Sequence, residues 1–337
     1  MIPFDAIATK KMFQLNSSYI AFPNIAIAQL ETSNIIKISK HRSYEKFMWD
    51  KDQYQFPTGI NDSFLVYKCE KKRINKKLYI IGITTFNRLS YLKKCLESLY
   101  GTISNKIDYI FIVADGCSYD GTLEWLIQQT FPDNISYYVI SNPNHFIYRQ
   151  SNCILNFSNK FDFDLGFIIN DDLIFISNGW DVKYDTAVKK HNFDHLVYFD
   201  KSFKRSKFYK INTDLQSHCD AEYCQGALFT FTKKIINTVG YFDEDNFKIR
   251  GQSHIDFTMR CCRKGYNDIN TLWDIKDSEK YIILNNDSYV SSANKLPTLL
   301  REYHKVDVYE LKRRTNLIKN KNRGYINPQY KIIDRCT

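Results

Sequence analysis

The chain is organised around FDFDLGFIINDDLIFISNGW, which runs from Phe161 to Trp180. Phe167 to Ile169 predict a buried strand, because aromatic and β-branched side chains leave this run without a polar face. Leu173 to Ile176 predict a second short strand, so Asp171 and Asp172 stand at a strand end. Charged side chains are rarely buried unless they are paired or bind a cation. A divalent metal would explain the two carboxylates, and so would a simple Asn-Asp-Asp turn.

Strands and helices alternate before this stretch. Apolar runs without a polar face predict strands at Leu78–Thr84, Tyr109–Val113 and Ser136–Ile140. Apolar residues at helical spacing predict helices at Tyr91–Tyr100, Thr122–Gln129 and Gln150–Asn156. This alternation predicts an α/β fold with a mostly parallel sheet and helices on both faces.

Three loops should lie along one rim of this sheet, because ligands bind parallel sheets at the carboxyl ends of the strands. The first loop, Thr84–Arg88, combines small hydroxyl residues with an Arg that can hold a nucleotide base and its phosphates. The second loop, Ala114–Asp120, carries Asp115, whose carboxylate can accept the N–H of a uracil ring. The third loop is Asn170–Asp172.

Composition describes a soluble globular protein: of its 337 residues, 44% are hydrophobic and 25% are charged. The net charge is +10 and much of the excess lies in Lys71–Lys77 and Lys312–Arg323. Such clusters can meet anionic partners, but no DNA- or RNA-binding signature accompanies them, so we expect no nucleic-acid partner. Nine scattered cysteines predict reduced thiols. We expect a cytoplasmic protein, because no signal peptide and no run of about eighteen apolar residues is visible.

Changes in texture divide the chain into three parts. Residues 1–76 predict an N-terminal extension of mixed structure that ends in the basic run KCEKKRINKK, and residues 77–290 form the α/β domain. Residues 291–337 predict a basic, helical C-terminal segment with an irregular apolar face. This segment is interpreted as a helix packed on the main domain, a lid over an acceptor, or a surface helix in peripheral contact with anionic lipid.

Taken in order, five motifs resemble the family 2 glycosyltransferases of the GT-A fold. The resemblance covers roughly residues 78–290. The motifs are ITTFNR at Ile83–Arg88, VADGCSYDGT at Val113–Thr122, FIINDD at Phe167–Asp172, CQGALF at Cys224–Phe229 and VGYFDE at Val239–Glu244. Asp115 falls on the second acidic position of the family pattern, and FIINDD falls on its Asp-x-Asp-like motif.

The resemblance implies a Rossmann-like nucleotide-diphospho-sugar transferase that uses Mn²⁺ or Mg²⁺. Asp172, the last acid of its motif, is the implied metal ligand, since such a cation needs few protein carboxylates besides phosphate oxygens. Asn170 departs from the usual acid and predicts weaker metal binding. The donor-binding residues that the resemblance implies are Thr84, Phe86, Asn87, Arg88, Asp115, Arg149, Asn170, Asp171 and Gly226.

The start of a later helix carries the implied catalytic base. Relatives have a Glu-Asp pair where this chain has Ser253 and His254, whereas Asp256 and Arg260 match the family pattern. Asp256 is therefore a candidate base for the acceptor hydroxyl, and His254 is a candidate base or metal ligand. Alternatively, His254 and Asp256 are residues favoured by the helix dipole, and Asp256 and Arg260 form an ordinary i,i+4 ion pair.

These observations predict a metal-dependent, inverting glycosyltransferase that moves a sugar from a UDP-sugar to a glycan or polysaccharide. A catalytically degenerate module that binds nucleotide-sugar or glycan is the non-enzymatic alternative, because the Glu-Asp pair is missing. Sugar-phosphate nucleotidyl transfer is a further alternative, but that class carries a Gly-rich loop after its first strand. ITTFNRLS contains no glycine.

Overall fold

The computed structural model describes residues 63–142, 146–200, 210–247, 252–285, 308–320, 325, 332–334 and 336. The predicted N-terminal extension lies outside the described residues as far as residue 62. So do residues 286–307, which contain most of the apolar face predicted for the C-terminal segment.

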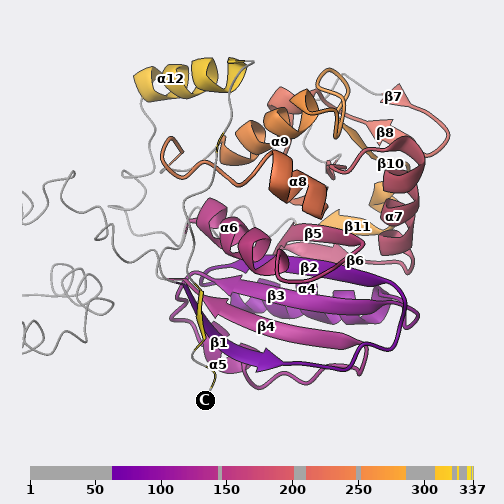
Figure 1. Cartoon of the computed structure of the whole chain (residues 1–337), viewed down its shortest axis with the longest axis vertical. Coiled ribbons are helices and arrows are strands. Elements are labelled where there is room, and N and C mark those ends of the chain that lie inside the picture. The colour runs from indigo at the N-terminus through magenta and orange to yellow at the C-terminus, as the bar shows by residue number, and fades with distance from the viewer. Residues whose placement is uncertain are drawn as a thin grey trace, which may run out of the picture. The chain divides into compact units, whose positions relative to one another are not determined.

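Four parallel strands form the centre of a seven-stranded sheet (Figure 1). They are β2 (Leu78–Thr85), β3 (Asp108–Asp115), β4 (Ile135–Ser141) and β5 (Leu165–Asn170). Every residue of β2 and β3 is buried, as expected for strands that are covered on both faces. Their spatial order is β4-β3-β2-β5, so the direction of strand addition reverses between β2 and β5. Such a reversal is where open α/β sheets bind ligands.

Three more strands complete the sheet. β9 (Leu228–Phe231) lies antiparallel to β5, and β1 (Ser63–Cys69) lies antiparallel to β4. β12 (Ile332–Asp334) pairs with β1 in parallel and forms the outer edge. The sheet thus begins at residue 63, earlier than the boundary predicted at residue 77, because the basic run before Leu78 connects β1 to β2. Part of the segment predicted to be helical also joins the sheet, as β12.

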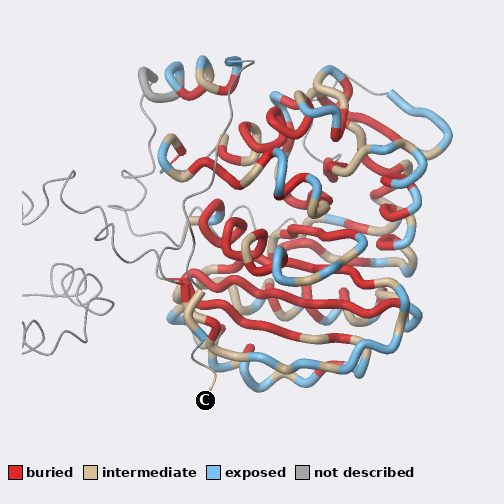
Figure 2. The backbone as a smooth tube through the Cα atoms, in the orientation of Figure 1, coloured by how far each residue is buried: buried red, intermediate tan, exposed pale blue. Residues whose placement is uncertain are grey.

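Helices cover both faces of this sheet, as the sequence predicts (Figure 1). On one face, α6 (Ile147–Ser158) packs against apolar residues such as Ile80 of β2. On the other face, α4 (Leu89–Thr102) and α5 (Thr122–Leu126) pack against residues such as Ile81. Neighbouring residues of one strand therefore serve opposite faces. Figure 2 shows the central strands buried over most of their length.

The second half of the chain builds a smaller layer beside the sheet (Figure 1). It contains α7 (Trp180–His191), α8 (Lys233–Thr238) and α9 (Ser253–Arg263). Its strands are β6 (Leu173–Phe175) paired with β11 (Ile282–Leu284), and β8 (Leu215–Ser217) between β7 (Lys210–Ile211) and β10 (Trp273–Ile275). Two short 3₁₀ turns, Ala221–Tyr223 and Ser278–Lys280, connect these elements.

Helix α12 (Val308–Lys319) lies within the predicted basic C-terminal segment. Its Ile318 is buried and its carbonyl oxygen accepts a hydrogen bond from Arg263 of α9. Arg313 donates to the backbone and side-chain oxygens of Asn246, both at 3.1 Å. The helix is thus packed on the main domain. Within the described residues, no helix combines the length and the apolar character that crossing a membrane requires.

Candidate active site

Asp171 and Asp172 lie in the turn between β5 and β6, and both carboxylates converge on one cation. The guanidinium of Arg88 places one nitrogen 2.8 Å from Oδ2 of Asp172 and the other 3.3 Å from Oδ1 of Asp171. The hydroxyl of Thr85 donates to Oδ2 of Asp171 at 2.7 Å. The acids therefore form the predicted turn and share the positive charge of Arg88, whereas metal binding by the pair stays a prediction.

The cation is needed because these acids are buried: Asp171 is 2% exposed and Asp172 is 8% exposed. Burial raises the pKa of Asp171, the guanidinium of Arg88 opposes this, and the neighbouring Asp172 adds to the rise. Two adjacent carboxylates out of water repel each other and bind cations in compensation. The charge arrangement thus fits a cation site at the strand-order reversal between β2 and β5.

The loops that follow β2 and β3 are joined to each other by hydrogen bonds. The backbone N–H of Asn87 donates to Oγ of Ser118 at 2.8 Å, and Oδ1 of Asn87 accepts from the backbone N–H of Tyr119 at 2.8 Å. Asn87 has φ of 52°, a left-handed conformation that Asn tolerates better than most residues. Asp120 accepts from the N–H of Leu89 at 3.0 Å and so caps α4 from the neighbouring loop.

Asp115 ends β3 beneath these loops. Its two carboxylate oxygens accept from the backbone N–H of Ser118 at 2.9 Å and from the Ser118 hydroxyl. Burial raises the pKa of Asp115, and the bonds from Ser118 oppose the rise. Two aromatic rings flank this rim: Phe86 and Tyr119 lie edge to face, with centroids 6.2 Å apart. Tyr119 is 75% exposed and was not predicted as a site residue, because one aromatic residue in a turn carries no periodic signal.

Gly226 and His254 are also brought together. Gly226 has φ of 70°, and a Cβ atom on it would lie 2.7 Å from Cγ of His254. Nε2 of His254 lies 3.1 Å from the carbonyl oxygen of Cys224. Because a carbonyl oxygen only accepts, Nε2 must carry the proton and Nδ1 must carry the lone pair. Burial lowers the pKa of His254, so the ring is neutral near pH 7.

Backbone pairing connects this glycine-histidine contact to the acidic turn. The N–H of Asn170 donates to the carbonyl oxygen of Ala227 at 2.9 Å, and Ala227 directly follows Gly226. The three loops predicted along one rim, Thr84–Arg88, Ala114–Asp120 and Asn170–Asp172, do lie at the carboxyl ends of parallel strands of one sheet. Thr84 itself is buried, and its hydroxyl has no hydrogen-bond partner among the described residues.

Asp256 is fully buried within α9 and forms the predicted i,i+4 ion pair, with Nε of Arg260 2.9 Å from its Oδ2. The other guanidinium nitrogens of Arg260 donate to the carbonyl oxygens of Val239 at 2.8 Å and Tyr241 at 2.6 Å. The pair thus connects α9 to the VGYFDE segment. A carboxylate held in this way is a poor candidate base, because its charge is already compensated.

Arg149 has a similar structural partner. It lies on α6, is 7% exposed and forms an ion pair with Glu244 of the VGYFDE segment. Nδ2 of Asn152 donates to Oε1 of Glu244 at 2.7 Å, while Oδ1 of Asn152 accepts from the N–H of Phe242 at 2.8 Å. Burial raises the pKa of Glu244 to about 7, against the opposing charge of Arg149. This network favours packing over phosphate binding as the role of Arg149.

The acidic turn offers two carboxylates as possible metal ligands. Among the residues that the structure describes, no three His, Cys, Asp or Glu side chains are grouped so that they could hold a metal ion. A hard cation of a nucleotide-sugar site needs only one or two carboxylates besides phosphate oxygens. Asp171 and Asp172 fit this requirement, since they already converge on the charge of Arg88.

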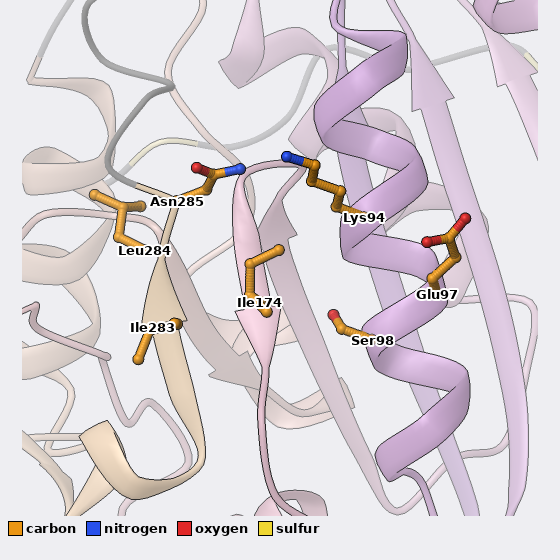
Figure 3. A pocket seen from close by; sticks show the side chains of 7 residues that line it. All are labelled: Lys94, Glu97, Ser98, Ile174, Ile283, Leu284 and Asn285. Carbon is orange, nitrogen blue, oxygen red and sulfur yellow. The ribbon is translucent and has the colours of Figure 1, made fainter.

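A shallow pocket of about 610 Å³ adjoins the acidic turn (Figure 3). Its walls come from α4 and from the β6–β11 ribbon, and the N–H of Asn285 donates to the carbonyl oxygen of Asp172 at 2.9 Å. Figure 3 shows the side chains of Lys94 and Asn285 directed towards each other near Ile174. The lining residues are Lys94, Glu97, Ser98, Ile174, Ile283, Leu284 and Asn285. No sequence motif marks this pocket, because its walls lie far apart in the chain.

No protein-family model matches the chain. An uncharacterized glycosyltransferase of Acanthamoeba polyphaga mimivirus is 28% identical over 222 residues, which are 63% of this chain and 83% of that protein. The chain is thus homologous to a glycosyltransferase, and the predicted enzyme class is confirmed at this level. Membership of family 2 stays a prediction.

Two solved structures of glycosyltransferases show a weaker overall likeness. TarS of S. aureus in complex with UDP-GlcNAc is 17% identical, with a TM-score of 0.45 and coverage of 61% of this chain and 57% of that chain. The mannosyltransferase PcManGT of Pyrobaculum calidifontis in complex with GDP-Man and Mn²⁺ is 15% identical, with a TM-score of 0.42 and coverage of 59% and 55%. This chain therefore spans less than two thirds of either structure. At TM-scores below 0.5, neither likeness determines the ligand of this chain.

Proposed function

We propose that this chain is a metal-dependent, inverting glycosyltransferase that moves a sugar from a UDP-sugar to a glycan or polysaccharide. One observation carries the proposal: two buried carboxylates, Asp171 and Asp172, converge on a single cation at the strand-order reversal of the sheet. Homology to a glycosyltransferase supports the reaction class. The donor sugar, the acceptor and the metal are parts of the proposal.

The donor would lie along the rim formed by the first two loops. Asp115 would accept the N–H of the base, the ring of Phe86 would flank it, and Asn87 keeps both loops in place. The exposed ring of Tyr119 is well placed to cover a bound nucleotide. Aromatic side chains commonly hold nucleic-acid bases through their π faces. Arg88 would contact the donor phosphates.

Asp172, aided by Asp171, would hold Mn²⁺ or Mg²⁺. Bound there, the cation would neutralise the pyrophosphate charge that develops as the leaving group departs. The chain itself contributes the carboxylates and the Thr85 hydroxyl that orients Asp171. A hydrogen-bonded carboxylate keeps its oxygens in a fixed direction, which is how outer partners support metal ligands.

His254 is the proposed base. Its Nε2 donates to Cys224, so Nδ1 has the lone pair that can take the proton of an acceptor hydroxyl. The hydroxyl oxygen would then attack the anomeric carbon while the bond to the nucleoside diphosphate breaks. One displacement inverts the configuration and needs no covalent intermediate. Asp256 is the less favoured base, because Arg260 holds its carboxylate inside α9.

Turnover of a panel of UDP-sugars tests the proposal. Release of UDP should require Mn²⁺ or Mg²⁺ and should stop with a chelator. Asp172→Ala should abolish turnover while circular dichroism shows an unchanged fold. Full activity with the chelator would refute the metal, and wild-type activity of Asp172→Ala would refute the role of Asp172.

A nucleotide-sugar-binding module without activity is the second candidate. The observation that favours it is the local chemistry of α9, where Ser253 and His254 replace the usual acids and Asp256 is already paired. Calorimetry that detects UDP-sugar binding without turnover across the donor and acceptor panels would favour the module. Cytoplasmic location and contact of the basic C-terminal segment with anionic lipid stay predictions.

A further inference from the structure

Arg88 provides the positive charge that lies between the two acids of the turn. Each of its terminal nitrogens contacts a different carboxylate, at 2.8 Å from Asp172 and 3.3 Å from Asp171. The side chain of Arg88 is 22% exposed, compared with 11% for Asp172 and 3% for Asp171. The guanidinium is thus the part of this cluster that solvent and a ligand reach most readily.

A divalent cation and the guanidinium of Arg88 would compete for the carboxylate of Asp172. A metal on the Asp172 carboxylate would lie close to the positive charge of Arg88, and like charges in a buried place repel strongly. Binding of the metal therefore requires the guanidinium to withdraw. Without another anion, this withdrawal leaves Arg88 uncompensated, which weakens metal binding by the protein alone.

The backbone of Arg88 is held at the start of α4, whereas its side chain reaches the two acids. Its carbonyl oxygen accepts from the N–H groups of Tyr91 and Leu92, both at 3.0 Å, in the first turn of α4. The guanidinium carbon lies 4.9 Å from the centre of the Tyr91 ring in the same helix turn. A diphosphate bound at this rim would offer the guanidinium a bidentate anionic partner.

We propose that Arg88 is a built-in countercation that couples the binding of metal and nucleotide. Without a donor it neutralises Asp171 and Asp172. When a nucleoside diphosphate takes the guanidinium, Asp172 becomes available to the divalent cation. Each ligand then raises the affinity for the other by the same factor, as thermodynamic linkage requires. This inference rests on the proposed function and concerns the regulation of the same site.

Titration of Mn²⁺ by calorimetry or by electron paramagnetic resonance, with and without UDP, tests the coupling without any turnover. In the wild-type protein, UDP should tighten Mn²⁺ binding about tenfold or more. In Arg88→Ala, Mn²⁺ should bind about tenfold more tightly than in the wild type when UDP is absent. UDP should then tighten Mn²⁺ binding by a smaller factor than in the wild type, because only its phosphate oxygens contribute. Arg88→Gln, which keeps a polar side chain but removes the charge, should behave in the same way if Arg88→Ala folds poorly.

Lys93→Ala is the matched control, because it removes one positive charge from the same helix, and the Lys93 ammonium lies over the ring of Trp125 rather than on the two acids. It should keep the wild-type coupling factor. Arg88 variants that bind Mn²⁺ no more tightly than wild type, or that keep its coupling factor, would overturn the inference. If the wild type turns over UDP-sugar with Mn²⁺ in that case, the proposed function still stands. Absence of Mn²⁺ binding from wild type even with UDP would overturn both the inference and the proposed metal.

Discussion

The imidazole ring of His254 lies directly on the backbone of Gly226. A Cβ atom at position 226 would approach Cγ of the ring to 2.7 Å, which is closer than real Cβ atoms come to other atoms. Because the φ angle of Gly226 is 70°, this residue also has a backbone conformation that side chains disfavour. The absence of a side chain at Gly226 thereby allows the position of the His254 ring, whose Nδ1 is the proposed base.

Gly226→Ala should displace His254 and lower kcat more than it changes KM. The φ angle alone should cost about 1 kcal/mol of folding free energy. Gly265→Ala is the matched control, since Gly265 has φ of 81° but nothing lies within 4 Å of its added Cβ. The melting temperature should fall in both variants, whereas kcat should fall in Gly226→Ala alone. Equal kinetics in the two variants would contradict the contact with His254.

The pH dependence of kcat/KM should report His254. Burial lowers the pKa of this ring from its ordinary value of 6.5, so protonation should remove activity only below that pH. His254→Gln should reduce kcat by about 100-fold or more, in the range of lost acid-base catalysis. The residual activity should lose this acidic limb. An acidic limb that is unchanged in His254→Gln would assign it to another group.

Thr85→Val should weaken Mn²⁺ binding about 10- to 100-fold, because it removes the hydroxyl that donates to Asp171 and keeps the shape of the side chain. Thr84→Val is the natural comparison on the same strand. The Thr84 hydroxyl is buried without a hydrogen-bond partner among the described residues, so its loss should leave Mn²⁺ affinity unchanged. Titration with Mn²⁺ in the absence of nucleotide measures the affinity of each variant. Equal losses in the two variants would show that Thr85 does not act through Asp171.

Asp274 should make stability depend on pH. It is fully buried on β10 and accepts from the Tyr184 hydroxyl at 2.6 Å, and burial raises its pKa from 3.8 to about 7. Between these values the folded state keeps a proton that the unfolded chain releases. The contribution of Asp274 to the free energy of unfolding is therefore complete below about pH 4 and is lost as pH rises through about 7.

Asp274→Asn should remove this contribution while keeping an oxygen for Tyr184. The melting temperature of the wild type should fall more between about pH 5 and pH 8 than that of the variant. Asp171 and Glu244 also have raised pKa values, so the difference between the two proteins is the informative quantity. Parallel curves for the wild type and the variant would show that Asp274 does not titrate in this range.

The sequence predicted the central strands well, because burial on both faces leaves them no polar residues. The strand predicted at Leu78–Thr84 is observed as Leu78–Thr85, and the helix predicted at Tyr91–Tyr100 extends to Leu89–Thr102. The predicted boundary at residue 77 misses β1, because a run of lysines marks exposure equally in a linker and in a loop between two strands of one sheet. Local charge does not reveal a distant β partner.

Of the predicted site residues, those in the loops after β2, β3 and β5 lie where a parallel sheet must place them. Arg149, His254 and Asp256 lie on helices α6 and α9 instead. Their partners could not be predicted, since each depends on segments far apart in the chain. The contact of Arg88 with Asp172 joins residues 84 positions apart, and that of Arg149 with Glu244 joins residues 95 positions apart. The tautomer of His254 likewise depends on the carbonyl group of Cys224, which no motif specifies.

The outer edge of the main sheet has a consequence for how the protein is made. Strand β1 is among the first described residues to be synthesised, yet its parallel partner β12 emerges only when translation has reached Asp334. Until then the backbone of Ser63–Leu65 is an open edge that other chains can join. A recombinant protein shortened before Ile332 would keep this edge exposed permanently. Aggregation during expression, rather than loss of catalysis, is the defect to expect from such a truncation.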